Sequence, residues 1–257
     1  MITRWAWLRL IGLFALSLAV VGCSTDATRN GAALGKGDWP APQLTSGTAP
    51  LKVLVLGGTS GIGLEVVKQS VARGHQVTAV ARHPERMKFS HASLTTTKGD
   101  VMDAEAMARI VPGQDIVINA IGVGPTRKRV TVFSQGMKNI LAVMPATGRL
   151  LAVTGIGAGN SRGHGSFFYD NILWPLLLKT VYQDKDIQEA LIRDSALDWT
   201  IVRPGFLVDD PAEKRYYVIK SMQDFRSGDI SRADVGHFLV ACFEQQLYQQ
   251  ETVFLSN

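Results

Sequence analysis

The residues that could do chemistry begin with a glycine-rich run placed between the apolar stretch Leu51–Leu56 and a helical pattern. The run, Gly57 to Gly63, has the spacing Gly-x-x-x-Gly-x-Gly. Glycines at these points permit a tight turn and a close approach of backbone to a pyrophosphate, while the following helix supplies amide donors and a favourable dipole. Strand, loop and helix occur in that order, so the run predicts a dinucleotide site rather than a purely structural turn. The residues expected to bind the cofactor here are Gly57, Thr59, Ser60, Gly61, Ile62 and Gly63.

Arg82 ends the second apolar stretch, about 20 residues beyond the glycine run. An acidic residue at this point would bind the ribose hydroxyls of NAD, whereas an arginine matches the 2′-phosphate of NADP. The sequence therefore favours NADP(H) over NAD(H). Lys88 could assist, and the alternative interpretation is that Arg82 is only a solvated loop residue.

Two later turns are further candidates for cofactor contacts. Asp100 and Val101 follow the predicted strand 94–98. The edge of an adenine could form hydrogen bonds with the Asp100 side chain and the Val101 amide. Ala120 and Gly122 follow the next pattern, where backbone should run beside the cofactor. Either turn could instead be an ordinary loop.

Alternating strands and helices must position these loops. The alternation predicts an α/β fold, a Rossmann-like doubly wound parallel sheet in a single domain. The apolar stretch Gly163–Val181 does not fit the alternation, and we interpret it either as a helix covering a substrate pocket or as core. The predicted strands are residues 51–56, 76–81, 94–98, 115–120, 149–154, 199–202 and 253–255, and the predicted helices are 62–73, 104–110, 130–143, 183–193 and 232–243.

The composition agrees with a globular protein. The chain has 257 residues, of which 46% are hydrophobic and 19% charged, so a disordered or collagen-like protein is excluded. Two cysteines exclude a disulfide framework and a four-thiolate zinc site, and the histidines lack metal-ligand spacing. The net charge of +5 is mild, and we interpret the basic triplet Arg127-Lys128-Arg129 as a solvated loop. We therefore expect neither a metal nor a nucleic-acid partner.

The C-terminal half is similar to a known family. The residues that carry the similarity are Asp184–Glu189, Ser195–Gly205 and Ile230–Val235. Together with the glycine run, they resemble the atypical NAD(P)H-binding branch of the short-chain dehydrogenase/reductase superfamily, related to biliverdin-reductase-B/flavin-reductase proteins and to NmrA-like proteins. The resemblance covers Leu51–Asn257, although Ser60 stands where atypical members often have glycine.

The resemblance implies a catalytic set from which this sequence departs. The family uses a Ser or Thr near the fifth strand and a Tyr-x-x-x-Lys, in which the tyrosine exchanges a proton and the lysine lowers its pKa. Thr154 is the hydroxyl near the fifth strand, and Tyr182 is followed by Lys185 and then Asp186. Lys185, at i+3, still faces the same side of a helix as Tyr182. The catalytic candidates are therefore Thr154 and a displaced pair, Tyr182 and Lys185, and the alternative is a surface tyrosine and lysine.

The first residues resemble a bacterial lipoprotein signal peptide. Arg4 and Arg9 accompany the apolar stretch Leu10–Val21, which is shorter than the roughly 20 residues of a membrane span. Val20-Val21-Gly22-Cys23 resembles a lipobox, which implies cleavage before Cys23 and lipidation of that cysteine. Several acyl chains would then anchor the protein firmly. The alternative is an uncleaved single-span anchor.

We accordingly divide the chain into a signal peptide at 1–22, a flexible tether at 23–50 and an NAD(P)-binding domain at 51–257. The expected location is the bacterial cell envelope, lipid-anchored at the outer membrane or on the periplasmic face. The alternative is a membrane anchor facing the cytoplasm, where free NADPH is mainly found.

The expected function is that of an oxidoreductase which transfers a hydride from NADPH to a small carbonyl, quinone or flavin-like acceptor. The displaced tyrosine and lysine leave open an alternative, a non-catalytic NADP-binding sensor or assembly factor. The expected walls of the substrate pocket, Gly163–Val181 and Leu207–Phe225, carry no signature of a particular substrate.

Overall fold

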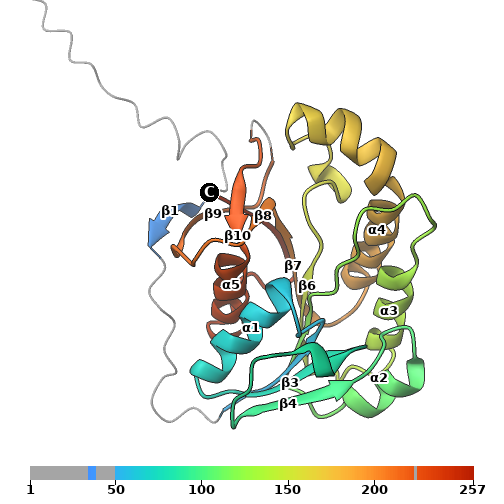
Figure 1. Ribbon diagram of the computed structural model, residues 1–257, viewed down its shortest axis with the longest axis vertical. Helices are drawn as coiled ribbons and strands as arrows, with labels where there is room; N and C mark the ends of the chain where they lie inside the picture. Colours follow the sequence, from blue (N-terminus) through green and yellow to red (C-terminus); the bar gives the residue numbers. More distant parts are fainter. Residues whose placement is uncertain (1–33, 39–49, 223–224) are drawn as a thin grey trace, which may run out of the picture.

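A mixed sheet with helices on both faces forms the centre of the molecule (Figure 1). The computed structural model describes residues 34–38, 50–222 and 225–257, and within them nine strands pair in the order β1-β9-β11-β7-β6-β5-β2-β3-β4. All neighbours from β11 to β4 are parallel, whereas β9 and β1 are added antiparallel at one edge. The strands are β1 (Leu34–Asp38), β2 (Lys52–Leu56), β3 (Gln76–Ala81), β4 (Leu94–Lys98), β5 (Ile116–Asn119), β6 (Arg149–Val153), β7 (Asp198–Pro204), β9 (Arg215–Ile219) and β11 (Glu251–Ser256).

The helices cover the sheet in two layers. Figure 1 shows α1 and α5 on one face and α2, α3 and α4 on the other. A separate two-stranded ribbon pairs β8 (Phe206–Val208) with β10 (Asp229–Ser231). The helices are α1 (Gly61–Ala72), α2 (Ala104–Ile110), α3 (Val132–Leu141), α4 (Lys179–Arg193) and α5 (Arg232–Glu244), and the short helical segments are η1 (Pro84–Arg86), η2 (Gly159–Ser161) and the π-helical η3 (Tyr169–Leu178).

Strand β2 shows why the sheet is buried on both faces. Val53 and Val55 pack in the cluster beneath α1 and α5, whereas Leu54 and Leu56 pack in the cluster beneath α2, α3 and α4. All four side chains are fully buried. Successive residues of a strand point to opposite faces, so a continuous apolar run fits a strand with helices on both sides.

The predicted Rossmann-like, doubly wound α/β fold is confirmed, and its sheet is mostly parallel. Each strand and helix that the sequence predicts is present, with ends that differ by a few residues. The largest difference in a helix is at α4, which begins at Lys179 rather than at 183, because η3 continues directly into it.

Some of the chain differs from the expectation. Within the stretch expected to be a flexible tether, β1 pairs antiparallel with β9. The predicted signal peptide, residues 1–22, and the predicted lipidation site Cys23 lie outside the described residues. None of the helices in the described part of the chain is both long and apolar enough to span a membrane.

The apolar stretch 163–181 forms η3 and the start of α4. It is not plain core, because Phe167, Phe168, Ile172 and Leu176 are exposed to solvent. In Figure 1 it is the gold helix at the top, beyond the end of α4.

Candidate functional site

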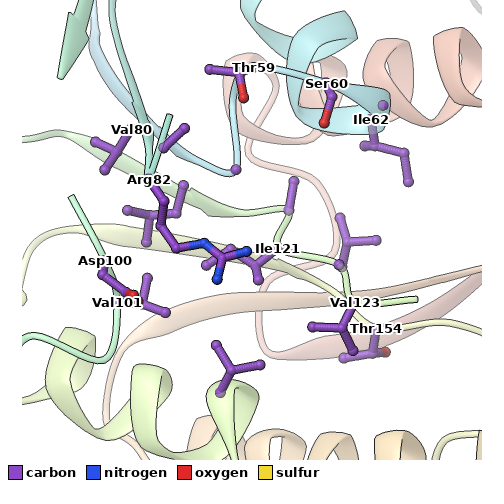
Figure 2. Close-up of a pocket in the computed structure, with 18 of the residues that line it drawn as sticks. Thr59, Ser60, Ile62, Val80, Arg82, Asp100, Val101, Ile121, Val123 and Thr154 are labelled. Carbon is purple, nitrogen blue, oxygen red and sulfur yellow. The ribbon is translucent and has the colours of Figure 1, made fainter. Parts of the chain in front are cut away.

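A cavity of about 900 Å³ opens at the carboxyl ends of the central strands (Figure 2). From β2 the chain winds toward β3 and β4 in one direction and resumes at β5 in the other, which is the switch point where doubly wound sheets bind ligands. Of the residues predicted for the site, Gly63 does not line this cavity. The predicted residues that do line it are Gly57, Thr59, Ser60, Gly61, Ile62, Arg82, Asp100, Val101, Ala120, Gly122, Thr154, Tyr182 and Lys185.

The glycine loop brings α1 directly against the end of β2. Gly57 has a φ of 82° and donates its N–H to the Val80 carbonyl at 2.9 Å. Gly63 packs against the backbone of the loop, and a Cβ at this position would lie 2.3 Å from the Gly57 carbonyl oxygen. Only a residue without a side chain permits this packing, which is the role expected of the last glycine in such a loop.

The first turn of α1 is open to an anion. Ser60 precedes the helix in an extended conformation and its side chain makes no capping hydrogen bond. The early amides of a helix have no partner within the helix, and their N–H groups and the helix dipole favour a negative charge. This turn lines the cavity with Thr59, Ser60, Gly61 and Ile62 and is therefore a ready site for a pyrophosphate.

Arg82 extends from the end of β3 across the cavity, with Thr59 on one side and Asp100 on the other in Figure 2. The 3₁₀ turn η1 brings Arg86 to the lining as well. The nearby carboxylate of Glu85 lies 3.1 Å from His83 Nδ1, and Glu85 does not line the cavity. Two exposed guanidinium groups thus stand where a 2′-phosphate is expected.

The turns after β4 and β5 are fixed by side chains. Asp100 Oδ1 accepts a hydrogen bond from the Met102 N–H at 3.0 Å, and Asn119 Oδ1 accepts one from Ile121 at 3.4 Å. Both turns therefore hold their backbone along the cavity wall, with Ala120 and Gly122 in the second.

Tyr182 projects from α4 into the cavity lining and is 8% exposed. Its hydroxyl lies 2.9 Å from the hydroxyl of Tyr169, which also lies 2.7 Å from the Ile156 carbonyl oxygen. Burial raises the pKa of Tyr182 to about 12, while the hydrogen bond from Tyr169 acts to lower it. Tyr182 therefore keeps its proton at neutral pH, and Tyr169 lies where it can stabilise the oxygen after that proton has left.

Lys185 lies one helical turn from Tyr182, with its Nζ 5.6 Å from the centre of the Tyr182 ring. The ammonium donates to the carbonyl of Thr154 and lies 5.0 Å from the Phe133 ring. Burial lowers the pKa of Lys185 to about 8, partly opposed by the negative charge of Glu189. The two members of the predicted displaced pair are thus together at the cavity, and neither is a surface residue.

Thr154 differs from the hydroxyl that the family pattern implies. Its Oγ1 donates to Glu189 Oε1 at 2.7 Å, so its proton is already used inside the protein. Glu189 is fully buried and receives Arg203 Nε at 2.9 Å and Nη2 at 2.5 Å. Burial acts to raise the pKa of Glu189, but the hydrogen bonds and charge of Arg203 outweigh it and the pKa is lowered. Thr154 can therefore accept a hydrogen bond from a ligand but has no free proton to donate.

Asp186 stands four residues after Tyr182, where the family pattern has lysine, and it has a structural role there. Its Oδ1 accepts from the Gly159 N–H at 2.7 Å and its Oδ2 pairs with Arg162 Nη2 at 3.0 Å. Asp186 thus fastens the loop after β6 to α4, and it does not line the cavity.

Arg86 and Arg232 line the cavity and Tyr169 contacts Tyr182, and the sequence predicted none of these three side chains for the site. Arg232 lines the cavity beside the glycine loop, since a Cβ on Gly61 would lie 3.9 Å from its Nε, and its Nη1 pairs with Asp209 at 2.7 Å. Pro84 could have indicated the turn η1, because proline favours the first position of a helical turn, and η1 carries Arg86 to the cavity lining. Tyr169 and Arg232 depend on tertiary packing, which no local pattern signals.

Comparison with known proteins assigns the family. The NAD(P)H-binding family matches residues 57–246, which is well over half of the chain. The chain belongs to this NAD(P)H-binding family. The match includes the glycine loop and the residues of α4 and β7 on which the resemblance to atypical short-chain dehydrogenases/reductases rests.

Individual relatives extend over most of the described fold. The chain is 27% identical to the uncharacterised protein YwnB of Bacillus subtilis over 64% of this chain and 76% of that protein. It is 30% identical to an uncharacterised chloroplastic protein of Arabidopsis thaliana over 79% of this chain and 74% of that protein.

Solved structures share the fold. The anaerobillin reductase ChuY of Escherichia coli has a TM-score of 0.67 at 22% identity, covering 80% of this chain and 96% of that chain. A short-chain dehydrogenase/reductase of Veillonella parvula in complex with NADP has a TM-score of 0.67 at 16% identity, covering 81% of this chain and 95% of that chain.

Proposed function

We propose that the protein is an NADPH-dependent reductase that acts on a small carbonyl, quinone or flavin-like acceptor. The observation that carries this proposal is one continuous cavity lined at one end by the glycine loop and Arg82, and at the other by Tyr182 and Lys185. A phosphate-binding end and a proton-donating end in the same cavity suit hydride transfer accompanied by protonation.

The residues present fit a bound dinucleotide phosphate. The open first turn of α1 would hold the pyrophosphate, and a Cβ at Gly63 would fill the space that the loop needs. Arg82 and Arg86 would bind the 2′-phosphate, whose charge they complement. NADPH, when bound, supplies the hydride.

Tyr182 would supply the proton. Because burial raises its pKa to about 12, the phenol stays protonated at neutral pH and can donate to the oxygen of an acceptor as that oxygen gains charge. Tyr169, at 2.9 Å, would then donate to the resulting phenolate. The Lys185 ammonium adds a positive charge close to the same ring. Thr154 would not donate to the substrate, and its backbone carbonyl would accept a hydrogen bond from the Lys185 ammonium.

The test combines cofactor titration with turnover. Residues 24–257, which include every described residue, are titrated with NADPH and NADH by cofactor fluorescence and then assayed for NADPH oxidation with carbonyls, quinones and flavins. We expect NADPH to bind more tightly than NADH, and Tyr182→Phe to lower turnover by about 10²–10⁴-fold with little change in NADPH affinity. Tyr248→Phe, a tyrosine outside the cavity lining, is the matched control. Absence of NADPH binding at millimolar cofactor would refute the proposal.

A second candidate function is favoured by one observation. The Thr154 hydroxyl donates to Glu189, so the hydroxyl that the family pattern places near the substrate has no free proton. A non-catalytic NADP-binding sensor or assembly factor would tolerate this arrangement. Tight NADPH binding without turnover across the whole panel would favour it, whereas any activity that Tyr182→Phe abolishes would exclude it.

We also propose that Cys23 is acylated and holds the protein to the bacterial cell envelope. The support is the lipobox-like sequence before Cys23. Mass spectrometry of the native N-terminus tests it: an acylated Cys23 supports export, whereas an intact Met1 would indicate an uncleaved anchor and favour the cytoplasmic face.

A further inference from the structure

The segment that precedes α4 presents an apolar stripe to solvent. Phe167 is 76% exposed, Phe168 61%, Ile172 41% and Leu176 54%. Ile172 and Leu176 lie on η3, and Phe168 immediately precedes it, so the three recur every four residues, close to one turn of a π-helix. Tyr169, the first residue of η3, is instead buried against the protein. η3 is therefore apolar on its inner and its outer face, as expected of a helix that is covered on both sides.

The stripe is unusual for this molecule. Among the described residues, eight large apolar side chains are exposed, and four of them are those of this stripe. The other four, Met102, Val123, Ile187 and Leu207, come from four different segments of the chain. Single exposed apolar residues are normal on a soluble surface, whereas a cluster marks an interaction site.

The basic triplet is fastened to this same segment. Thr126 donates its N–H to the Leu177 carbonyl at 2.9 Å, and Arg127 Nε donates to the Leu176 carbonyl at 3.2 Å. The Thr180 hydroxyl donates back to the Thr126 carbonyl at 3.2 Å. These bonds hold the loop 123–129 beside the C-terminal end of η3.

The charges beside the stripe are mainly positive. Arg127, Lys128 and Arg129 are all exposed, as is Lys179 at the start of α4. The acidic residue on η3 is Asp170, which is only partly exposed. An apolar stripe bordered by exposed cations complements a surface with an apolar interior and anionic groups at its edge.

We propose that η3 and the loop 123–129 form a docking surface for an anionic lipid bilayer. The stripe Phe167, Phe168, Ile172 and Leu176 enters the boundary between headgroups and acyl chains, and Arg127, Lys128 and Arg129 contact lipid phosphates. Interfacial helices bind in this way, with the apolar face roughly 5–10 Å deep and Lys and Arg at the headgroups. A second copy of the chain is a poorer occupant, because it would bring two basic triplets to one interface.

This surface adjoins the cavity. Ile121 and Gly122, just before the loop 123–129, and Val123, its first residue, line the cavity, and Val123 is itself 38% exposed. An apolar acceptor dissolved in the bilayer would thus reach the cavity along this loop. That corollary rests on the proposed reductase function, whereas lipid binding by the surface does not.

Vesicle binding by residues 24–257 tests the proposal without any contribution from residues 1–22 or from acylation. The protein is sedimented with vesicles of phosphatidylglycerol and, separately, of phosphatidylcholine. We expect partition to phosphatidylglycerol that weakens as salt is raised, and weaker partition to phosphatidylcholine. Ile172→Glu/Leu176→Glu should reduce the partition coefficient by about a hundredfold or more, because each of the two buried side chains contributes at least about tenfold.

The matched control is Ile187→Glu, which makes the same change at a 51% exposed isoleucine of α4 outside the stripe and should bind like the wild type. Lys128→Ala/Arg129→Ala should reduce binding to phosphatidylglycerol and remove most of its salt dependence. Circular dichroism and thermal melting establish that each variant is folded. The proposal is overturned if wild-type protein does not bind phosphatidylglycerol, or if Ile172→Glu/Leu176→Glu binds as well as Ile187→Glu. A dimer in solution that Ile172→Glu/Leu176→Glu converts to monomer would instead assign the stripe to a second copy.

Discussion

We expect the two guanidinium groups beside the end of β3 to set the preference of the site between NADPH and NADH. Arg82 and Arg86 both line the cavity, and charge-assisted hydrogen bonds to a phosphate contribute about 1.5–3 kcal/mol each. We therefore expect Arg82→Ala to weaken NADPH binding by about 10- to 100-fold in fluorescence titration, while NADH affinity changes little. Arg86→Ala should act in the same direction.

Lys88→Ala is the matched control for these changes. This substitution removes a positive charge two residues beyond Arg86. Lys88 does not line the cavity, so its loss should leave the affinities for NADPH and NADH unchanged. Equal losses of NADPH and NADH affinity in Arg82→Ala would contradict a 2′-phosphate contact and would place Arg82 at the pyrophosphate or in the fold.

Lys185 should make stability depend on pH. Burial lowers its pKa to about 8 from an ordinary 10.5, so between about pH 8 and 10.5 the unfolded chain binds more protons at this position than the folded chain. The free energy of unfolding should consequently rise with pH across that window, by up to about 3 kcal/mol relative to Lys185→Met, which has no proton to lose. Urea titrations at several pH values measure the difference.

An exposed lysine of the same helix provides the control for that measurement. Lys179→Met should shift the urea midpoint by the same amount at every pH, because Lys179 is exposed. If the free energies of unfolding of the wild type and Lys185→Met ran parallel from pH 8 to 10, the prediction that burial lowers the pKa of Lys185 would be wrong.

At the scale of elements, the junction of β2, the glycine loop and α1 depends on one missing side chain. A Cβ at Gly63 would lie 2.3 Å from the Gly57 carbonyl oxygen, a contact that only backbone movement can relieve. Gly63→Ala should lower stability by about 1–3 kcal/mol and weaken NADPH binding, since the loop must move. Gly124→Ala is the matched control, because a Cβ at Gly124 meets nothing within 4 Å. Equal urea midpoints for the two variants would show that the loop tolerates a side chain.

Local patterns predicted the parallel elements well and the edge of the sheet poorly. The runs Val53–Leu56 and Ile116–Ile118 are continuously apolar because helices cover both of their faces, so composition alone reveals them. β9, Arg215–Ile219, begins with an exposed residue, ends with two buried ones and lies within the stretch expected to be a pocket wall. Of that stretch, Leu207 lines the cavity. No residue of 163–181 lines it, although Tyr169 of η3 lies 2.9 Å from the Tyr182 hydroxyl, and Tyr182 does line the cavity.

The whole molecule explains why the position of the glycine loop and Arg82 was easier to predict than the surroundings of Thr154. The glycine loop and Arg82 act close to where they stand in the sequence, at the ends of adjacent strands. The surroundings of Thr154 depend instead on Glu189 and Arg203, which come from α4 and β7 and meet only when those elements pack. A pattern of residue types shows a hydroxyl near a strand end, but not that its proton is already bonded to a buried carboxylate.

Cofactor binding should stabilise the molecule as a whole, because the cavity joins the loops after β2, β3, β4, β5 and β6. A ligand that binds only the folded state at about a hundredfold above its Kd adds roughly 2.7 kcal/mol. For a domain of this size, that corresponds to a rise in Tm of about 5–10 °C. Thermal denaturation with NADPH should show this rise, NADH at the same concentration should show less, and Arg82→Ala should reduce the NADPH shift toward the NADH value. Equal shifts with both cofactors in the wild type would remove the basis for NADP preference, because the 2′-phosphate is the only group by which the two differ.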